Sequence, residues 1–320
     1  MMTMHAFNEA RTRLQERTHV TPVLSSKTLN DEIGTQVFIK AEHLQKTGSF
    51  KIRGATNRVT LAKEAGATHL LAASSGNHGQ AVAYIARTLG LPATIVVPED
   101  ANPAKLAAIR DYGSDIIPFG TTSKERIEHA KALEEKMNAT IIPPYDDDDI
   151  IAGQGTVGLE ILSQVRQPST VVVPIGGGGL IAGVATAIKS INPAVKVVGV
   201  EPQEANGAFL SREAGERVSI KASTSVADGL RSSTPGQLTF PLIETYVDDV
   251  VLVSEDDIRD AFTFYLSRMK QVVEPSGAVS LAALRAGKIE HHPEDKVVLV
   301  ASGGNLDLQS VQQYLSPNIG

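Results

Sequence analysis

Cysteine is absent from this chain of 320 residues, and its absence excludes several kinds of chemistry together. Disulfides, thiolate metal sites, cysteine nucleophiles and thiol redox reactions all need the missing side chain. The chain also has no excess of positive charge: its formal net charge is -6 and its sequence pI is about 5.8. No broad cationic surface is therefore available to neutralise a phosphate backbone, and we expect no nucleic-acid partner.

Long apolar runs are also missing. No stretch approaches the roughly 18 to 20 apolar residues that a membrane-spanning helix needs. The N-terminal segment MMTMHAFNEARTRLQERTHV has no apolar run behind its charges, so it does not resemble a secretory signal. We expect no membrane partner and a cytoplasmic location, which a chain without disulfides also suits.

What the sequence does contain, from residue 69 onward, is a regular alternation of apolar β-rich runs and helical segments. The segments between the runs have apolar residues at helical intervals, which predicts a helix between each pair of strands. The second of these helices should have Asn102 as its N-cap and Pro103 at its first position. This alternation is typical of a parallel sheet with crossover helices. The four runs are HLLAAS (69–74), ATIVVP (93–98), SDIIPF (114–119) and ATIIPPY (139–145).

A second series follows, with helices expected after the strands and a long helix from about Glu255 to Lys270. We predict an α/β fold with two parallel-sheet lobes: a large domain of residues 1–60 and 141–320 and a small, mobile domain of residues 66–140. The strands of the large domain are TQVFIKAE (35–42), TVVVPI (170–175), KVVGVE (196–201), DDVVLVS (248–254) and KVVLVAS (296–302).

The run of four aspartates at 146–149 could suggest a metal site. Consecutive carboxylates in a loop usually point in different directions into water, so we expect a solvated loop here.

Three turns directly after strands carry the strongest functional signal: SSGNHG (74–79), GGGGL (176–180) and SGGNLD (302–307). Ligands of open α/β sheets bind outside the carboxyl ends of the strands. Two lobes with such turns predict a ligand in the cleft between them.

The glycine loop, Gly176 to Gly179, lies between an apolar strand and a helix, where free backbone amides can converge on an anion. The Gly-Lys-Ser/Thr ending of a nucleoside triphosphate loop is absent. Two alternatives to a phosphate cup stay open: tight strand-helix packing alone, and a dinucleotide site, because Gly177, Gly179 and Ala182 satisfy G-x-G-x-x-A and Glu201 ends the next strand.

Lys51 stands in the segment TGSFKIRGA, between Phe50 and Ile52. A lone lysine is ordinarily a surface residue. An amine that reacts with carbonyl groups benefits from partly apolar surroundings, which lower its pKa.

Five motifs in this order, SFKIRGA, SSGNHGQA, IAGQGT, GGGGLIAG and SGGN, span nearly the whole chain. Together they resemble the fold type II pyridoxal phosphate enzymes, which have a tryptophan synthase β-like fold with the cofactor in the cleft. The chain is most similar to the serine/threonine dehydratase family, in its serine racemase and threonine dehydratase branch. The resemblance implies β-elimination from an amino acid such as L-threonine or L-serine, giving a 2-oxo acid and ammonia, and a homodimer.

The resemblance also assigns roles. It implies that Lys51 holds pyridoxal 5'-phosphate as a Schiff base and acts as the base for the α-proton, that Phe50 packs against the ring, and that Asn77 hydrogen-bonds the ring hydroxyl. The glycine loop would bind the phosphate, and Ser302 would face the pyridine nitrogen, where a serine does not keep that nitrogen protonated. The SSGNH loop would grip the substrate carboxylate; it consists of Ser74, Ser75, Gly76, Asn77 and His78. For His78, a packed histidine without a catalytic role is the alternative.

The resemblance leaves racemisation open. Ser75 stands where the racemase branch has a serine on the opposite face of the cofactor, which makes a serine or aspartate racemase the main alternative. Tyr145 looks like the dehydratase pattern, since mammalian-type serine racemases have asparagine there. Arg126 matches an arginine at the entrance, which would suit 3-hydroxyaspartate; an exposed helical arginine is the alternative interpretation.

A divalent cation (Mg, Ca or Mn) is the second cofactor that the racemase-like branch implies. Its ligand positions correspond here to Glu201, Ala205 and Gly207, so the second carboxylate of that site is missing. Hard cations need several oxygen ligands, and we therefore expect no essential metal.

Overall fold

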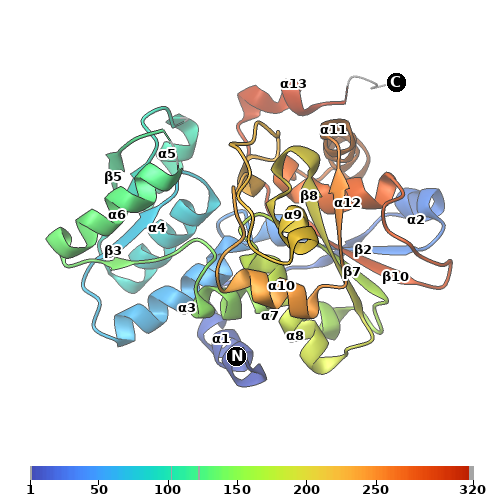
Figure 1. Cartoon of the computed structure of the whole chain (residues 1–320), viewed down its shortest axis with the longest axis horizontal. Coiled ribbons are helices and arrows are strands. Elements are labelled where there is room, and N and C mark those ends of the chain that lie inside the picture. The colour runs from blue at the N-terminus through green and yellow to red at the C-terminus, as the bar shows by residue number, and fades with distance from the viewer. Residues whose placement is uncertain (1, 102, 122, 317–320) are drawn as a thin grey trace.

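The computed structural model of the chain describes residues 2–101, 103–121 and 123–316. Its elements form two sheets that lie side by side (Figure 1). The smaller sheet has the strand order β5-β4-β3-β6, and its neighbouring strands are all parallel. The strands are β3 (Leu70–Ala73), β4 (Ala93–Val97), β5 (Asp115–Pro118) and β6 (Thr140–Ile141).

Helices follow three of these strands, as the alternating pattern predicts: α4 (Asn77–Leu89), α5 (Pro103–Asp111) and α6 (Ser123–Met137). The α5 helix begins at the expected Pro103, while the N-cap predicted at Asn102 lies outside the described residues.

The larger sheet has the order β1-β2-β10-β7-β8-β9. Its strands are parallel except for β1, which pairs antiparallel with β2 at one edge. The strands are β1 (Val23–Ser25), β2 (Gln36–Lys40), β7 (Thr170–Pro174), β8 (Lys196–Pro202), β9 (Asp249–Val253) and β10 (Lys296–Val300). The predicted strand at 35–42 therefore joins the C-terminal strands.

Helices cover both faces of this sheet. One core contains apolar side chains of α7 (Asp148–Gln164), α8 (Gly179–Ile191) and α10 (Thr239–Tyr246). The other contains those of α2 (Lys27–Ile33), α11 (Glu255–Phe264) and α12 (Pro275–Arg285). Helix α1 (Met4–Leu14) packs on α7. Further helical segments are α9 (Gly207–Ala214), α13 (Val311–Tyr314) and the short turns η1 (Glu42–Leu44), η2 (Gln203–Ala205), η3 (Asp228–Leu230) and η5 (Leu308–Ser310).

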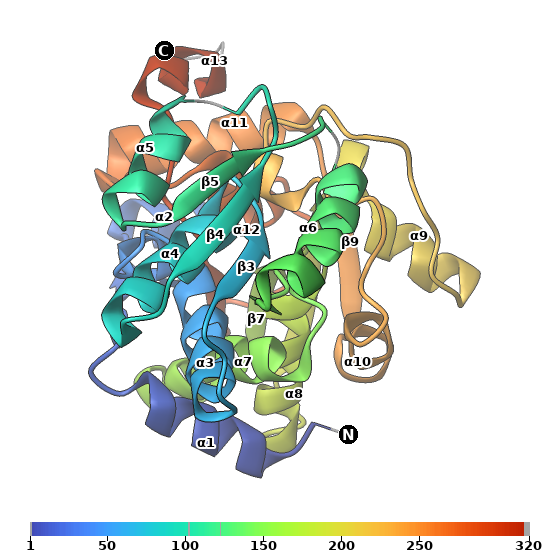
Figure 2. The same cartoon turned by 90° about the vertical axis from the view of Figure 1, so that its left-hand side faces the viewer.

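The helix α3 (Lys51–Glu64) contacts both α4 and α7 and lies between the two parts of the molecule (Figure 1). Figure 2 shows the molecule from the side of the small sheet, which lies in front. The α3 side chains Ile52, Ala55 and Val59 are buried in the core of the small sheet. The opposite side of α3 meets α7, where the Gly54 N–H donates to the Gln154 side chain at 3.1 Å. A Cβ on Gly153 would lie 2.6 Å from the Gly54 Cα, so the two backbones approach too closely for a side chain.

One local prediction needs correction. The aspartates at 146–149 are not a solvated loop: Asp147 caps α7 by accepting the N–H groups of Asp149 and Ile150, and Asp146 accepts those of Gln237 and Leu238. Carboxylates at a helix start are favoured by the orphan amides there, and this outweighs solvation.

The long helix predicted from about Glu255 to Lys270 is confirmed in its extent, and it is α-helical as far as Phe264. A π-helical turn, η4 (Tyr265–Met269), follows and ends at Lys270 with φ of 58°. Among the described residues, no helix combines the length and the apolar character needed to cross a bilayer.

Candidate active site

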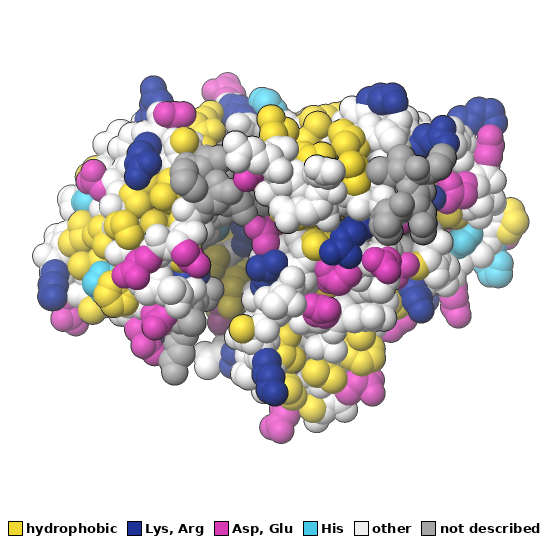
Figure 3. Space-filling model, turned by 90° about the horizontal axis from the view of Figure 1, so that it is seen from above, with side chains coloured by type: hydrophobic (Ala, Val, Ile, Leu, Met, Phe, Trp, Pro, Cys, Tyr) yellow, Lys and Arg dark blue, Asp and Glu magenta, His cyan; other side chains and the backbone are white. Residues whose placement is uncertain are grey.

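A pocket opens where the starts of α3 and α8 meet the end of β10, and the surface is hollowed between the two lobes above it (Figure 3). The predicted Phe50, Lys51 and Ser302 line this pocket together with the glycine loop. The other lining residues are Tyr145, Pro174, Leu180, Gly229 and Leu230.

The glycine loop is closely covered, so the absence of side chains there is a requirement. Gly178 has φ of +94°, and a Cβ on it would lie 2.7 Å from the Thr239 Oγ1. A Cβ on Gly177 would lie 2.4 Å from the Tyr145 ring. Since α8 begins at Gly179, the loop presents backbone amides at a helix start, which is an anion-binding geometry.

The Lys51 side chain ends in the same pocket. Its Nζ donates to the Pro144 carbonyl oxygen at 2.6 Å and lies 5.3 Å from the centre of the Phe50 ring. Burial lowers the pKa of the Lys51 amine to about 8. A larger fraction of this amine is therefore neutral and nucleophilic near neutral pH than of an ordinary lysine, although most of it is still protonated below pH 8.

Ser302 is 3% exposed at the end of β10, and its carbonyl accepts the Phe50 N–H at 3.0 Å. This bond joins the segment before α3 to the last strand of the large sheet. It brings the hydroxyl-bearing Ser302 and the amine-bearing Lys51 into one pocket with Phe50.

Asn77, the first residue of α4, has two side-chain partners that the sequence reasoning missed. Its amide nitrogen donates to Glu274 at 2.7 Å, and its oxygen accepts from Asn305 at 2.8 Å. Asn305 also donates to the Thr47 carbonyl at 2.7 Å. Asn305 stands in the SGGN motif, and this position in a functional turn could have indicated it as a site residue. Glu274 lies in none of the motifs, so nothing in the sequence indicated its role.

The SSGNH loop forms the turn from β3 into α4. The Ser74 Oγ accepts the Gly76 N–H at 3.3 Å, and Ser75 lies partly exposed between them. His78 is buried, and its Nε2 lies 2.8 Å from the Ile142 carbonyl oxygen. Burial, and then the nearby charge of Lys51, lower the pKa of His78 to about 3, so the ring is neutral at physiological pH.

One short segment, residues 142–145, connects these parts. It offers the Ile142 carbonyl to His78, the Pro144 carbonyl to Lys51 and the Tyr145 side chain to the glycine loop. Sequence reasoning noted Tyr145 alone here, because backbone carbonyls leave no signature in residue type.

Arg126 lies on α6, partly buried and close to the charges of Asp100 and Glu125. Burial lowers its pKa, and the two carboxylates oppose this shift. Within the described part of the chain, the pocket is lined by other residues.

The cation-site positions do not suit a metal ion. Both oxygens of the buried Glu201 carboxylate accept backbone amides at the start of α9, from Ala208 at 3.0 Å and Phe209 at 2.8 Å. Burial raises the pKa of Glu201 to about 8, which disfavours the charged form that a cation would need. No group of three or more metal-binding side chains occurs in the ranges that the structure describes.

The glycine cradle and the buried amine together fit a cofactor that carries a phosphate and a carbonyl carbon, and comparison with known proteins agrees. The family model described as pyridoxal-phosphate dependent enzyme matches residues 14–303. This chain belongs to that family. The nicotinamide alternative for the glycine loop is thereby set aside, and the predicted two-lobed α/β fold is confirmed.

Three relatives show the range of activities near this chain. An L-threonine ammonia-lyase from Thermotoga maritima is 41% identical over all of this chain and 79% of its own length. An L-threo-3-hydroxyaspartate ammonia-lyase from Saccharomyces cerevisiae is 40% identical over 96% of this chain and 94% of its own. The structure of maize serine racemase superposes with a TM-score of 0.93 at 38% identity, covering 98% of this chain and 96% of that one.

Proposed function

We propose that this protein is a pyridoxal-phosphate-dependent ammonia-lyase that dehydrates and deaminates a β-hydroxy amino acid, such as L-threonine or L-serine, to a 2-oxo acid and ammonia. The observation that carries the proposal is the Lys51 amine, whose pKa is lowered by burial, in the same pocket as the glycine loop. The 41% identity with an L-threonine ammonia-lyase across the whole chain supports the choice of reaction.

The chain's own residues divide the work. When bound, pyridoxal phosphate supplies an electron sink that acidifies the α-C–H bond of an amino acid. The glycine loop would hold the phosphate. The Lys51 amine would hold the carbonyl carbon of the cofactor and, once the amino group of the substrate takes its place there, would be free to accept the α-proton. Ser302 would be a neutral partner for the pyridine nitrogen and would limit how much negative charge moves into the ring.

The substrate would be held by the SSGNH loop. Ser74, Ser75 and the amides at the start of α4 lie at a helix N-terminus, which favours a carboxylate. Asn77 would face the ring hydroxyl, with its amide oriented by Glu274 and Asn305. The buried neutral His78 fits a packing role better than acid-base chemistry at physiological pH.

A second candidate function is racemisation of serine or aspartate. It is favoured by Ser75, which is partly exposed in the turn before Asn77, and by the similarity to maize serine racemase. Deamination of 3-hydroxyaspartate is a variant of the first function, favoured by the yeast relative. Arg126, the predicted partner for a second carboxylate, does not line the pocket.

We further propose that residues 66–140 move as a small domain over the pocket, that the protein is cytoplasmic, and that it forms a homodimer. The exposed apolar side chains Val20, Leu44 and Val272 support an interface between copies.

The test is a panel of L- and D-serine, L-threonine, L-aspartate and 3-hydroxyaspartate, assayed in parallel for 2-oxo acid and for the opposite enantiomer. The proposal expects oxo acid as the main product from an L-β-hydroxy amino acid. Enantiomer without oxo acid would replace the lyase with the racemase, and products from 3-hydroxyaspartate alone would narrow the substrate.

A further inference from the structure

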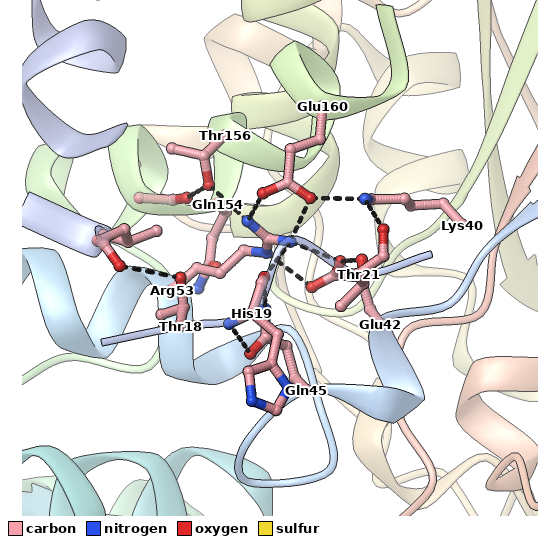
Figure 4. A network of polar contacts seen from close by, with 12 residues as sticks. Thr18, His19, Thr21, Lys40, Glu42, Gln45, Arg53, Gln154, Thr156 and Glu160 are labelled. Atoms are coloured by element: carbon pink, nitrogen blue, oxygen red, sulfur yellow. Dashed lines mark hydrogen bonds and ion pairs between the residues drawn. The ribbon is translucent and has the colours of Figure 1, made fainter. Parts of the chain in front are cut away.

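Two buried cations and two carboxylates meet behind the first turn of α3 (Figure 4). The Arg53 guanidinium contacts a carboxylate at each of two edges. Its Nε and Nη2 donate to Glu42 at 2.7 and 2.8 Å, and its Nη1 and Nη2 donate to Glu160 at 2.6 and 2.8 Å. Paired contacts of this kind are among the strongest and most directional hydrogen bonds in proteins.

The rest of the network balances these charges. The Lys40 Nζ donates to Glu160 at 2.5 Å and to the Thr21 carbonyl at 2.8 Å, and the Thr21 hydroxyl donates to Glu42 at 2.5 Å. Burial raises the pKa of Glu42, but Arg53 and Lys40 outweigh it and hold that pKa below its usual value. The formal charges of the two cations and the two carboxylates sum to zero.

The network joins α3, which packs in the core of the small sheet, to elements of the large-sheet part. Lys40 ends β2, Glu42 begins η1 two residues later, and Glu160 lies on α7. Three of the four charges therefore belong to the large-sheet side. Arg53 lies on α3, whose Ile52 and Ala55 are buried in the core of the small sheet. The network thus ties the first turn of a shared helix to one side only.

Lys51 stands two residues before Arg53, so the two side chains leave α3 in nearly opposite directions. No side chain caps the start of α3, because its N-cap is Phe50. The backbone bond from Phe50 to Ser302 holds the turn before Lys51, and Arg53 holds the turn after it.

We propose that Arg53 is a positioning residue, which fixes the first turn of α3 against Glu42 and Glu160 so that the Lys51 amine meets the cofactor held by the glycine loop. The proposal rests on the proposed role of Lys51. A buried ion-pair network contributes little stability relative to apolar packing, but it determines geometry when every donor has a partner. Lysine at position 53 would keep the charge and lose the fork that reaches both carboxylates.

The test is Arg53→Lys, with Arg58→Lys as the matched control. Arg58 lies on the same helix and donates to Asp147 at 3.1 Å, but its side chain is 22% exposed. Apoprotein is mixed with pyridoxal phosphate, and samples are reduced with borohydride at successive times. The readout is the rate at which the cofactor becomes covalently fixed on Lys51. We expect that rate to fall about 100-fold in Arg53→Lys, the loss that a misplacement of about 1 Å can cause.

The control variant should attach the cofactor at the wild-type rate, and Arg53→Lys should still retain cofactor non-covalently through the glycine loop. A folded Arg53→Lys protein with the wild-type attachment rate would overturn the proposal, as would a loss of thermal stability alone. Attachment does not depend on whether the enzyme is a lyase or a racemase, so the panel of substrates can fail without affecting this result.

A second variant, Glu160→Gln, covers the case in which Arg53→Lys does not fold. Glutamine keeps the size and one acceptor oxygen, while Arg53 retains its paired contact with Glu42. We expect slower attachment, with an effect smaller than that of Arg53→Lys. Attachment at the wild-type rate in folded Glu160→Gln would likewise overturn the positioning role.

Discussion

The Nζ of Lys51 lies 2.6 Å from the carbonyl oxygen of Pro144, in the segment that also contacts His78 and the glycine loop. A single backbone acceptor thus holds the amine in a pocket that otherwise offers it little hydration. The pocket lowers the pKa of the amine by burial, and Pro144 fixes its direction. This relationship underlies the first two predictions.

Replacing Lys51 with alanine should abolish elimination while leaving the phosphate site intact. We expect kcat to fall by at least about 100- to 10,000-fold, the usual contribution of a general base. The control is Lys46→Ala, because Lys46 is a partly exposed lysine five positions earlier whose Nζ donates to the Glu16 carbonyl. Oxo-acid production, together with cofactor absorbance after dialysis, separates loss of the base from loss of the cofactor.

The rate of covalent attachment should rise with pH through about 8. Only the neutral amine attacks a carbonyl carbon, and burial favours the neutral form by lowering the Lys51 pKa from 10.5 to about 8. The amine is therefore mostly protonated below pH 8 and mostly reactive above it. Stopped-flow absorbance of apoprotein mixed with cofactor gives the midpoint; a midpoint near 10.5 would show that the pocket does not lower this pKa.

Alanine at Gly178 should weaken cofactor binding strongly. The added Cβ would lie 2.7 Å from the Thr239 Oγ1 at a φ of +94°, so both the contact and the backbone conformation oppose it. Gly34→Ala is the control, since Gly34 also has a positive φ but a Cβ added there would meet nothing within 4 Å. Equal cofactor affinity in the two variants would mean that the glycines serve packing alone.

Ser75→Ala should change the ratio of racemisation to elimination. Elimination needs the Lys51 amine on one face, whereas racemisation needs a proton donor on the other. Deamination of the L-amino acid should persist, with a higher KM if Ser75 also binds the carboxylate. A ratio that stays the same in the variant would assign Ser75 a structural role and remove the main support for a racemase.

Removal of divalent cations should leave activity unchanged. The Glu201 carboxylate is already occupied by the Ala208 and Phe209 amides, and Gly207 provides no second carboxylate. Turnover before and after dialysis against EDTA measures this. Activity lost on dialysis and restored by Mg²⁺ would contradict the assignment.

The sequence predicted the order of strands and helices well, because each strand is an apolar run bounded by turn residues. Prediction from the sequence failed where a residue's hydrogen-bond partner lies far away along the chain. The aspartates at 146–149 gave no sign that Asp146 accepts amides from residues 237 and 238, and the β1 edge strand is only three residues long.

The residues of the candidate site also fall into two groups: those that the sequence indicates and those that only the fold brings in. Lys51, the glycine loop and Ser302 stand in recognisable motifs, and they line one pocket. Glu274 belongs to no recognisable motif, and only the fold brings its side chain to Asn77. The Pro144 carbonyl that contacts Lys51 is a backbone group, which residue type cannot reveal.

The most direct test of the central claim is to treat the purified protein, saturated with pyridoxal phosphate, with borohydride and to map the modified peptide by mass spectrometry. The account predicts one pyridoxyl group on the peptide that contains Lys51, and none on that peptide in Lys51→Ala. A group fixed at another lysine, or no covalent attachment in a protein that nevertheless produces oxo acid, would contradict it.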